Sequence, residues 1–147
     1  MKWIAHRGNI NGINTERENH PDYIDEAILL GYDVEIDMWW IDGRTYLGHD
    51  EPQYEVDDDW LAERVDKLWV HCKNIELLNW IINTSLNYFW HTIDSYTLIS
   101  NKMVLVKPGE KLIQSSICCM PEWGYVGDIT KCYAIMTDEI IAFKNKI

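Results

Sequence analysis

Two histidines and two carboxylates are the residues of this chain best suited to chemistry. His6 closes the first apolar segment, and His49 follows a short hairpin signal. Between them, Glu35 and Asp37 alternate with apolar residues in the segment 33–40. One histidine can act as a general base and the other as a general acid, while the carboxylates can hold a divalent cation that neutralises charge at phosphorus. These residue types predict cleavage of a phosphodiester.

The spacing of Glu35 and Asp37 favours a metal site. Residues two apart on a strand point to the same face, and the tryptophans that follow, Trp39 and Trp40, indicate that both faces of this strand are covered. Buried carboxylates are costly unless they are paired or bound to a metal. The alternative is an edge strand whose charged face lies in water.

Cationic residues accompany these groups. Arg7 can bind a phosphate through two parallel hydrogen bonds. His71 and Lys73 share a face at the end of the apolar segment 68–71, so Lys73 either binds a phosphate or neutralises the carboxylates. A plain salt bridge is the alternative for Lys73.

Three further residues are predicted to lie around the site. Asp50, beside His49, can fix the tautomer of that imidazole. His91 closes the segment 88–91 and is predicted to stand behind the site as an interior histidine. Trp123, in a loop next to an acid, either forms a wall of the pocket or anchors the loop.

The elements that must position these residues alternate between strand and helix in the first half of the chain, which favours a parallel sheet. The second half retains strands but has few helices. A turn at 42–43 predicts a hairpin whose second strand is 44–47. Strands are expected at 2–7, 33–40, 68–71, 88–91, 103–106, 116–120 and 133–136, and helices at 21–30, 57–65, 75–82 and 140–143.

Length and composition are typical of a single-domain protein with a hydrophobic core. It has 147 residues, 47% of them apolar, and a net charge of -11. The length predicts one domain over residues 1–147. The negative charge argues against nucleic acid and anionic membranes as partners, although a bound cation and Lys73 can reverse the sign locally.

The four cysteines are predicted to be reduced, buried thiols, because no C-x-x-C spacing occurs. The first apolar segment begins two residues after the initial methionine, which leaves no room for a signal peptide. No apolar run is long enough to cross a bilayer, so no stable membrane anchoring is expected. These features predict a cytoplasmic location.

Taken in order, the motifs resemble those of the glycerophosphodiester phosphodiesterase family, within the phospholipase C-like phosphodiesterases. The match covers residues 1–74, with a weaker similarity at Thr137-Asp138, and this chain resembles a short, divergent member. H-R-G alone is unspecific, but the ordered set is fairly specific. The motifs are His6-Arg7-Gly8, Glu18-Asn19, Glu35-x-Asp37, Gly48-His49-Asp50 and Lys73.

The resemblance implies a TIM-type (β/α) barrel with its site at the carboxyl ends of the strands. At this length the barrel would be compact and helix-poor, with about seven to eight mostly parallel strands. We therefore expect the predicted site residues to converge in one pocket. The implied roles are His6 and His49 as the acid–base pair, Glu35 and Asp37 as ligands of Mg²⁺ or Ca²⁺, Arg7 and Lys73 as phosphate ligands, and Glu18 as the partner that orients Arg7.

One departure from the family pattern concerns the metal. The family places an acid two residues before the lysine, where this chain has His71. An imidazole as third ligand favours Mn²⁺ or Zn²⁺ over Ca²⁺; the alternative is weak metal binding or none.

Two functions remain open from the sequence. The first is metal-assisted cleavage of a small or lipid-derived phosphodiester by the histidine pair, through either a hydrolase or a lyase reaction. The second is a catalytically degenerate barrel that binds a phosphate ligand or a partner.

The apolar strands 103–106 and 116–120 lack helices to cover them, which predicts a homodimer packed through their outer faces.

Overall fold

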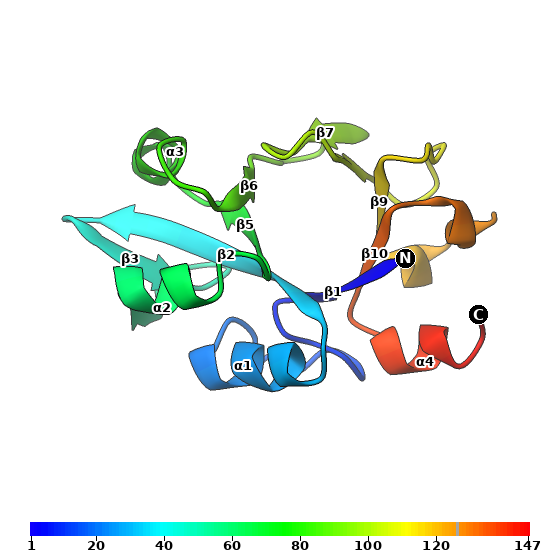
Figure 1. Ribbon diagram of the computed structural model, residues 1–147, viewed down its shortest axis with the longest axis horizontal. Helices are drawn as coiled ribbons and strands as arrows, with labels where there is room; N and C mark the ends of the chain where they lie inside the picture. The colour runs from blue at the N-terminus through cyan, green and yellow to red at the C-terminus, as the bar shows by residue number, and fades with distance from the viewer. Residues whose placement is uncertain (126) are drawn as a thin grey trace.

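The computed structural model describes residues 1–125 and 127–147, and Figure 1 shows a curved sheet with short helices on its outer side. The helices are α1 (Pro21–Leu29), α2 (Asp58–Glu63), α3 (Ile75–Ile81) and α4 (Ile140–Lys144), with 3-10 turns η1 (Pro121–Trp123) and η2 (Ile129–Lys131). The strands are β1 (Lys2–His6), β2 (Asp33–Ile41), β3 (Arg44–Leu47), β4 (Tyr54–Val56), β5 (Leu68–Cys72), β6 (Asn87–Phe89), β7 (Tyr96–Leu98), β8 (Val104–Val106), β9 (Ser116–Cys119) and β10 (Ala134–Thr137).

The strands form one mixed sheet with β1 near its centre. Parallel ladders join β6, β5, β2, β1, β10, β9 and β8 in that spatial order. The long strand β2 also pairs antiparallel with β3, which pairs with β4, and β7 pairs antiparallel with β8. The sheet is therefore a parallel array with an antiparallel extension on β2 and an antiparallel strand at the β8 end.

The prediction of a TIM-type barrel is wrong. Ten strands form a mixed sheet, and no ladder in the described part of the chain joins β6 to β7 to close it. Across this junction, Ser100 N–H donates to the Tyr88 carbonyl at 3.0 Å, and the Ser100 hydroxyl accepts from Tyr88 N–H at 3.0 Å. Because β7 pairs antiparallel with β8, it runs against the parallel strands, and two hydrogen bonds of Ser100 stand where a parallel barrel would have a ladder. The prediction that the fold has few helices is confirmed.

Capping residues explain where the short helices of the first half begin. The side chain of Asp57 accepts from Trp60 N–H at the start of α2, and that of Asn74 accepts from Leu77 N–H at the start of α3. Pro21 occupies the first turn of α1, where its missing N–H costs no hydrogen bond. Each of the three helices buries one or two apolar side chains against the sheet.

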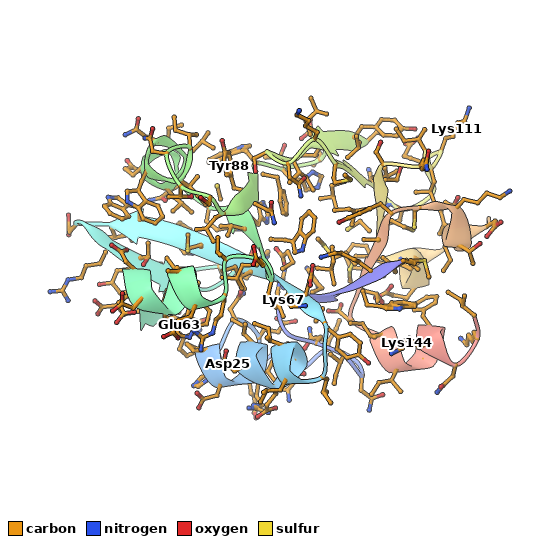
Figure 2. The ribbon with its side chains drawn as sticks, in the orientation of Figure 1. Asp25, Glu63, Lys67, Tyr88, Lys111 and Lys144 are labelled. Atoms are coloured by element: carbon orange, nitrogen blue, oxygen red, sulfur yellow. The ribbon has the colours of Figure 1, made fainter. Side chains whose placement is uncertain are left out.

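Ion pairs tie the outer elements together. Arg64, at the end of α2, donates to both carboxylate oxygens of Asp25 on α1, at 2.6 and 2.9 Å. Figure 2 shows Asp25 on α1 and Glu63 on the neighbouring α2. At the amino end of β2, the buried Asp33 contacts Lys2 at 2.7 Å and Lys67 at 3.2 Å. This carboxylate is thereby compensated at the end of the strand away from the predicted site.

The surface on which a homodimer was predicted is covered by loops of the same chain. Cys118 of β9 packs in a cluster with Cys132 and Ile135, against which Leu112 and Tyr125 also pack. Val106 of β8, which stands opposite Cys118, is likewise buried, at 1% exposure. These strands therefore do not present the uncovered apolar faces on which the dimer was predicted, and dimerisation itself stays a prediction. Among the described residues, no helix is both long and apolar enough to cross a membrane.

Candidate functional site

Asp37 is the centre of the group of predicted site residues. It lies on β2 where the strand passes from its β1 ladder to its β3 ladder, and its side chain is 1% exposed. The ladders fix its surroundings, because His71 on β5 stands opposite Asp37 and His6 on β1 stands opposite Glu35. Gly48 N–H donates to the Asp37 carbonyl at 3.1 Å, which brings the segment carrying His49 to the same place.

The two carboxylate oxygens of Asp37 have different environments. Oδ2 lies 3.0 Å from the Asn19 side-chain amide, 3.1 Å from Arg7 Nε and 3.2 Å from His49 Nδ1. Oδ1 is buried and has no hydrogen-bond partner in the described structure. Its basic neighbours are His71 Nδ1 at 3.1 Å and Lys73 Nζ at 3.7 Å. One oxygen is thus saturated and the other is available to a cation.

Glu35 completes a set of possible metal ligands. Ligand atoms of Glu35, Asp37 and His71 all lie within 4.8 Å of one another. Burial, and secondly the charge of Asp37, raise the pKa of Glu35. Burial acts in the same direction on Asp37, but the hydrogen bond from His49 and the charge of Arg7 outweigh it and hold the pKa of Asp37 well below the usual value. The pair therefore carries at least one firmly ionised carboxylate.

Both predicted catalytic histidines have a carboxylate at Nδ1. His6 Nδ1 donates to Asp138 Oδ1 at 2.9 Å, and its Nε2 lies 3.9 Å from Glu35. Burial lowers the pKa of His6, but the bond to Asp138 and the charge of Glu35 outweigh it and raise the pKa. His49 Nδ1 faces Asp37, and its Nε2 lies 3.3 Å from Arg7 Nη2. Arginine only donates, so His49 Nε2 is the acceptor in this contact.

Arg7 is held by several partners at once. Its Nη1 donates to Glu18 at 3.3 Å, its Nε faces Asp37 and its Nη2 faces His49. Arg7 also has a left-handed backbone conformation, with φ of 54°, which is a costly arrangement for a residue with a Cβ. The following Gly8 approaches Tyr23 so closely that an added Cβ would lie 2.9 Å from its ring. Contact with Glu18 is as expected, while phosphate binding by Arg7 stays a prediction.

The structure brings together most of the predicted site residues, although their roles stay predictions. Three of the predicted residues lie at the margin of this group. Asp50 is exposed and lies 3.7 Å from His49 Nε2, while Asp37 occupies Nδ1 in its place. The His91 carbonyl accepts from His71 Nε2 at 3.1 Å, so His91 supports the group through its main chain. Trp123 is 64% exposed on η1. The residues brought together are His6, Arg7, Glu18, Glu35, Asp37, His49, His71 and Lys73.

Sequence reasoning gave no role to three residues of the group. Asp138 follows β10 and binds both His6 and Asn9, whose amide also donates to Glu18 at 2.8 Å. Asn19 binds Asp37. The signals were present, because Asn19 and Asp138 both stand in the motifs that carried the family resemblance. Their partners could not be read from the sequence, since Asp138 lies 132 positions from His6.

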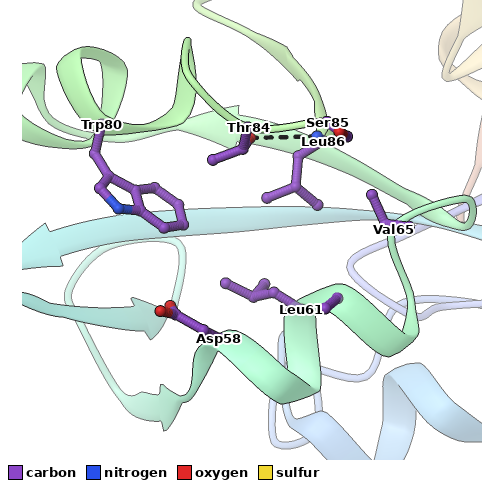
Figure 3. Close-up of a pocket in the computed structure, with 8 residues that line it drawn as sticks. Asp58, Leu61, Val65, Trp80, Thr84, Ser85 and Leu86 are labelled. Carbon is purple, nitrogen blue, oxygen red and sulfur yellow. Dashed lines mark hydrogen bonds between the residues drawn. The ribbon is translucent and has the colours of Figure 1, made fainter.

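A separate apolar pocket lies away from this group. It has a volume of about 330 Å³ and opens between α2 and the segment that follows α3 (Figure 3). The described residues that line it include none of the candidate catalytic or metal-binding residues. They are Asp58, Leu61, Ala62, Val65, Trp80, Thr84, Ser85 and Leu86.

Comparisons with known proteins leave the geometry as the basis for function. No family model, no curated protein and no solved structure matches this chain. The family similarity described from the motifs therefore rests on those motifs alone.

Proposed function

We propose that this chain is a metal-assisted phosphodiesterase acting on a small or lipid-derived phosphodiester. The observation that carries the proposal is the convergence on Asp37 of cationic and imidazole side chains from separate segments. Arg7, His49 and His71 all lie within about 3.2 Å of its carboxylate. Such a group, on different parts of the fold, fits acid–base chemistry at a charged phosphoryl centre.

The residues present fit a divalent cation. Asp37 Oδ1 is a buried oxygen without a hydrogen-bond partner in the described structure, and Glu35 and His71 face the same space. A buried acceptor that lacks a donor is costly, and a cation at Glu35, Asp37 and His71 would remove that cost. When bound, a dication there supplies charge stabilisation for the phosphoryl oxygens.

Side chains of the protein would supply proton transfer and neutralise the phosphate. His49 Nε2 accepts a hydrogen bond from Arg7, and once that guanidinium turns to the substrate phosphate this nitrogen can accept a proton from water or from a substrate hydroxyl. His6, held between Asp138 and Glu35, can donate a proton from Nε2 to the leaving alkoxide. Lys73, whose side chain is 17% exposed, can neutralise the phosphate.

A catalytically degenerate module that binds a phosphate ligand is the second candidate. The observation that favours it is the engagement of Arg7 by Glu18, Asp37 and His49, because a guanidinium so occupied is less free to bind a substrate phosphate. A reducing, cytoplasmic location remains part of the proposal and is supported by the four free thiols.

Hydrolysis of a bis-aryl phosphodiester by the metal-free chain, with each divalent cation added in turn, tests the proposal. The wild type should turn over only with metal. The variants His6→Ala and His49→Ala should each lower kcat about 100-fold or more. The double variant should cost little more than either single change, because the two residues act as one proton-transfer unit.

The matched control is His20→Asn. His20 caps α1 by accepting from Asp22 N–H at 3.2 Å, and asparagine preserves a helix cap. This variant should retain wild-type turnover. Absence of turnover in the wild type with every cation, together with retained binding of inorganic phosphate, would favour the binding module instead.

A further inference from the structure

The imidazole of His71 is held in one orientation. Its ring stacks on Phe89, with centroids 5.0 Å apart and planes at 12°. Nε2 lies 3.1 Å from the carbonyl oxygen of His91. The His91 segment is fixed in turn, because His91 Nδ1 lies 2.8 Å from the Thr97 hydroxyl. A carbonyl oxygen only accepts hydrogen bonds, so the proton of the neutral His71 ring is on Nε2.

This tautomer turns a lone pair toward the carboxylates. With Nε2 protonated, Nδ1 of the neutral ring is an acceptor, and it lies 3.1 Å from Asp37 Oδ1 and 3.9 Å from Glu35 Oε1. Asp37 Oδ1 is itself buried without a hydrogen-bond partner in the described structure, and the Lys73 ammonium lies 3.7 Å from it. Three electron-pair donors therefore face one space, an arrangement that a cation between them stabilises.

We propose that this space is a nitrogen-containing metal centre that selects a first-row transition dication over Mg²⁺ and Ca²⁺. This inference rests on the metal site of the proposed function. The ligands are Nδ1 of His71 and carboxylate oxygens of Glu35 and Asp37, and two carboxylates balance the charge of one dication. Mg²⁺ and Ca²⁺ prefer oxygen ligands throughout, whereas imidazole suits Zn²⁺, Fe²⁺ and Ni²⁺.

The surroundings of the ligands support a built site. Metal-bound histidines commonly donate their other ring N–H to a carbonyl or carboxylate, as His71 does to His91. Bound carboxylates are commonly hydrogen-bonded as well, and Asn19 donates to Oδ2 of Asp37 while leaving Oδ1 free. The ring orientation and the free oxygen are thus both fixed before any cation binds.

Calorimetric titration of the metal-free full chain with Zn²⁺, Mn²⁺, Mg²⁺ and Ca²⁺ tests the inference without an activity assay. Zn²⁺ should bind at least about 100-fold more tightly than Mg²⁺ or Ca²⁺, in line with the ligand preferences of these ions. In His71→Glu this Zn²⁺/Mg²⁺ ratio should fall at least about 10-fold, because an oxygen replaces the nitrogen. Bound Co²⁺ should lack the near-ultraviolet band of thiolate ligation, which excludes the cysteines.

The control variant His20→Asn removes an imidazole outside the group and should leave the ratio unchanged. An equal preference for Mg²⁺ in the wild type, an unchanged ratio in a folded His71→Glu, or a thiolate band would overturn the inference. Preference for Zn²⁺ without phosphodiester turnover would support the inference and count against the proposed function. Turnover with a preference for Mg²⁺ would do the reverse.

Discussion

Asn19 holds Asp37 by two hydrogen bonds at once. The side-chain amide of Asn19 donates to Asp37 Oδ2 at 3.0 Å, and the side-chain carbonyl of Asn19 accepts from the main-chain N–H of Asp37 at 2.9 Å. The main-chain N–H of Asn19 also donates to the Arg7 carbonyl at 3.0 Å. Asn19 has a φ of 61°, which asparagine tolerates better than most residues. Both residues are almost completely buried.

Asn19→Ala should therefore destabilise the chain by about 1–3 kcal/mol, because it leaves the buried N–H of Asp37 without an acceptor. Urea unfolding followed by tryptophan fluorescence measures the loss. The exposed Asn83 provides the control, since Asn83→Ala should change stability by less than about 0.5 kcal/mol. Equal stabilities of the two variants would show that the two bonds to Asp37 contribute little.

Asp138 is predicted to position His6 during catalysis. Asp138 accepts from His6 Nδ1, its own N–H donates to Glu122 at 2.9 Å and its carbonyl accepts from Gly12 N–H at 2.8 Å. Asp138→Ala should lower kcat about 10- to 100-fold with little change in KM, on the scale seen for partners that orient a functional histidine.

A spectroscopic measurement separates this role from a general loss of stability. Nitrogen-15 spectra of the wild type should show a proton on Nδ1 of His6, and the neutral ring in Asp138→Ala should gain the Nε2–H tautomer. Asp138→Asn retains an acceptor oxygen and should recover part of the wild-type signature. Asp33→Asn removes a buried carboxylate at the other end of β2 and should leave the nitrogen-15 signature of His6 unaltered. A wild-type His6 with no proton on Nδ1 would contradict the prediction.

Gly48 is required where the chain turns toward His49. Its φ is 151°, and a Cβ at this position would overlap the carbonyl oxygen of Glu51 and lie 3.2 Å from Gln53 N. Gly48→Ala should cost about 1–3 kcal/mol of stability through backbone strain and this clash. It should also displace His49 and lower kcat.

Gly43 offers a matched control for Gly48. Gly43 has a φ of +80°, but a Cβ there would meet nothing within 4 Å. Gly43→Ala should therefore show only the conformational cost, about 1 kcal/mol, with unchanged kcat. Thermal unfolding of both variants measures the difference, and equal losses in stability would rule out the clash as a cause.

The thiols are predicted to be unreactive in the folded chain. Burial raises the pKa of Cys118 to about 12, and the nearby Cys132 and Glu122 add to the effect. Burial likewise raises the pKa of Cys119. The thiolate is the reactive form, so a raised pKa removes it at neutral and mildly alkaline pH. Ellman's reagent should react slowly with the native chain and fully once guanidinium chloride unfolds it; rapid reaction of a native thiol is the contrary result.

Local patterns in the sequence predicted the centre of the site better than its surroundings. The two-residue spacing of Glu35 and Asp37 was enough to place both on one face, because strand geometry alone determines it. The bond between His6 and Asp138 depends on pairing of β1 with β10, which no local pattern encodes. The tautomer partner of His49 was predicted as its neighbour Asp50, whereas chain folding supplies Asp37.

The error in fold class has a similar origin. Apolar segments predicted most of the strands, but whether the sheet closes depends on how β6 and β7 meet in the folded chain, including the direction of β7. The segment that became β7 carries no strong apolar alternation, and its antiparallel pairing with β8 arises from tertiary packing. The motifs at the site were more informative than the overall pattern, because chemistry constrains residue type while packing constrains polarity and size and accepts several residue types.

Pairing of β1 with β10 also has a consequence for folding kinetics. Residues 2–5 pair with residues 134–137, so the central ladder joins the two most distant parts of the chain. Closing so long a loop has an entropic cost that must be met before the ladder gains stability, and such topologies fold slowly. During synthesis β1 leaves the ribosome long before β10. The edge of β1 that pairs with β10 therefore stays unpaired until β10 is synthesised, and the contact between His6 and Asp138 forms only then.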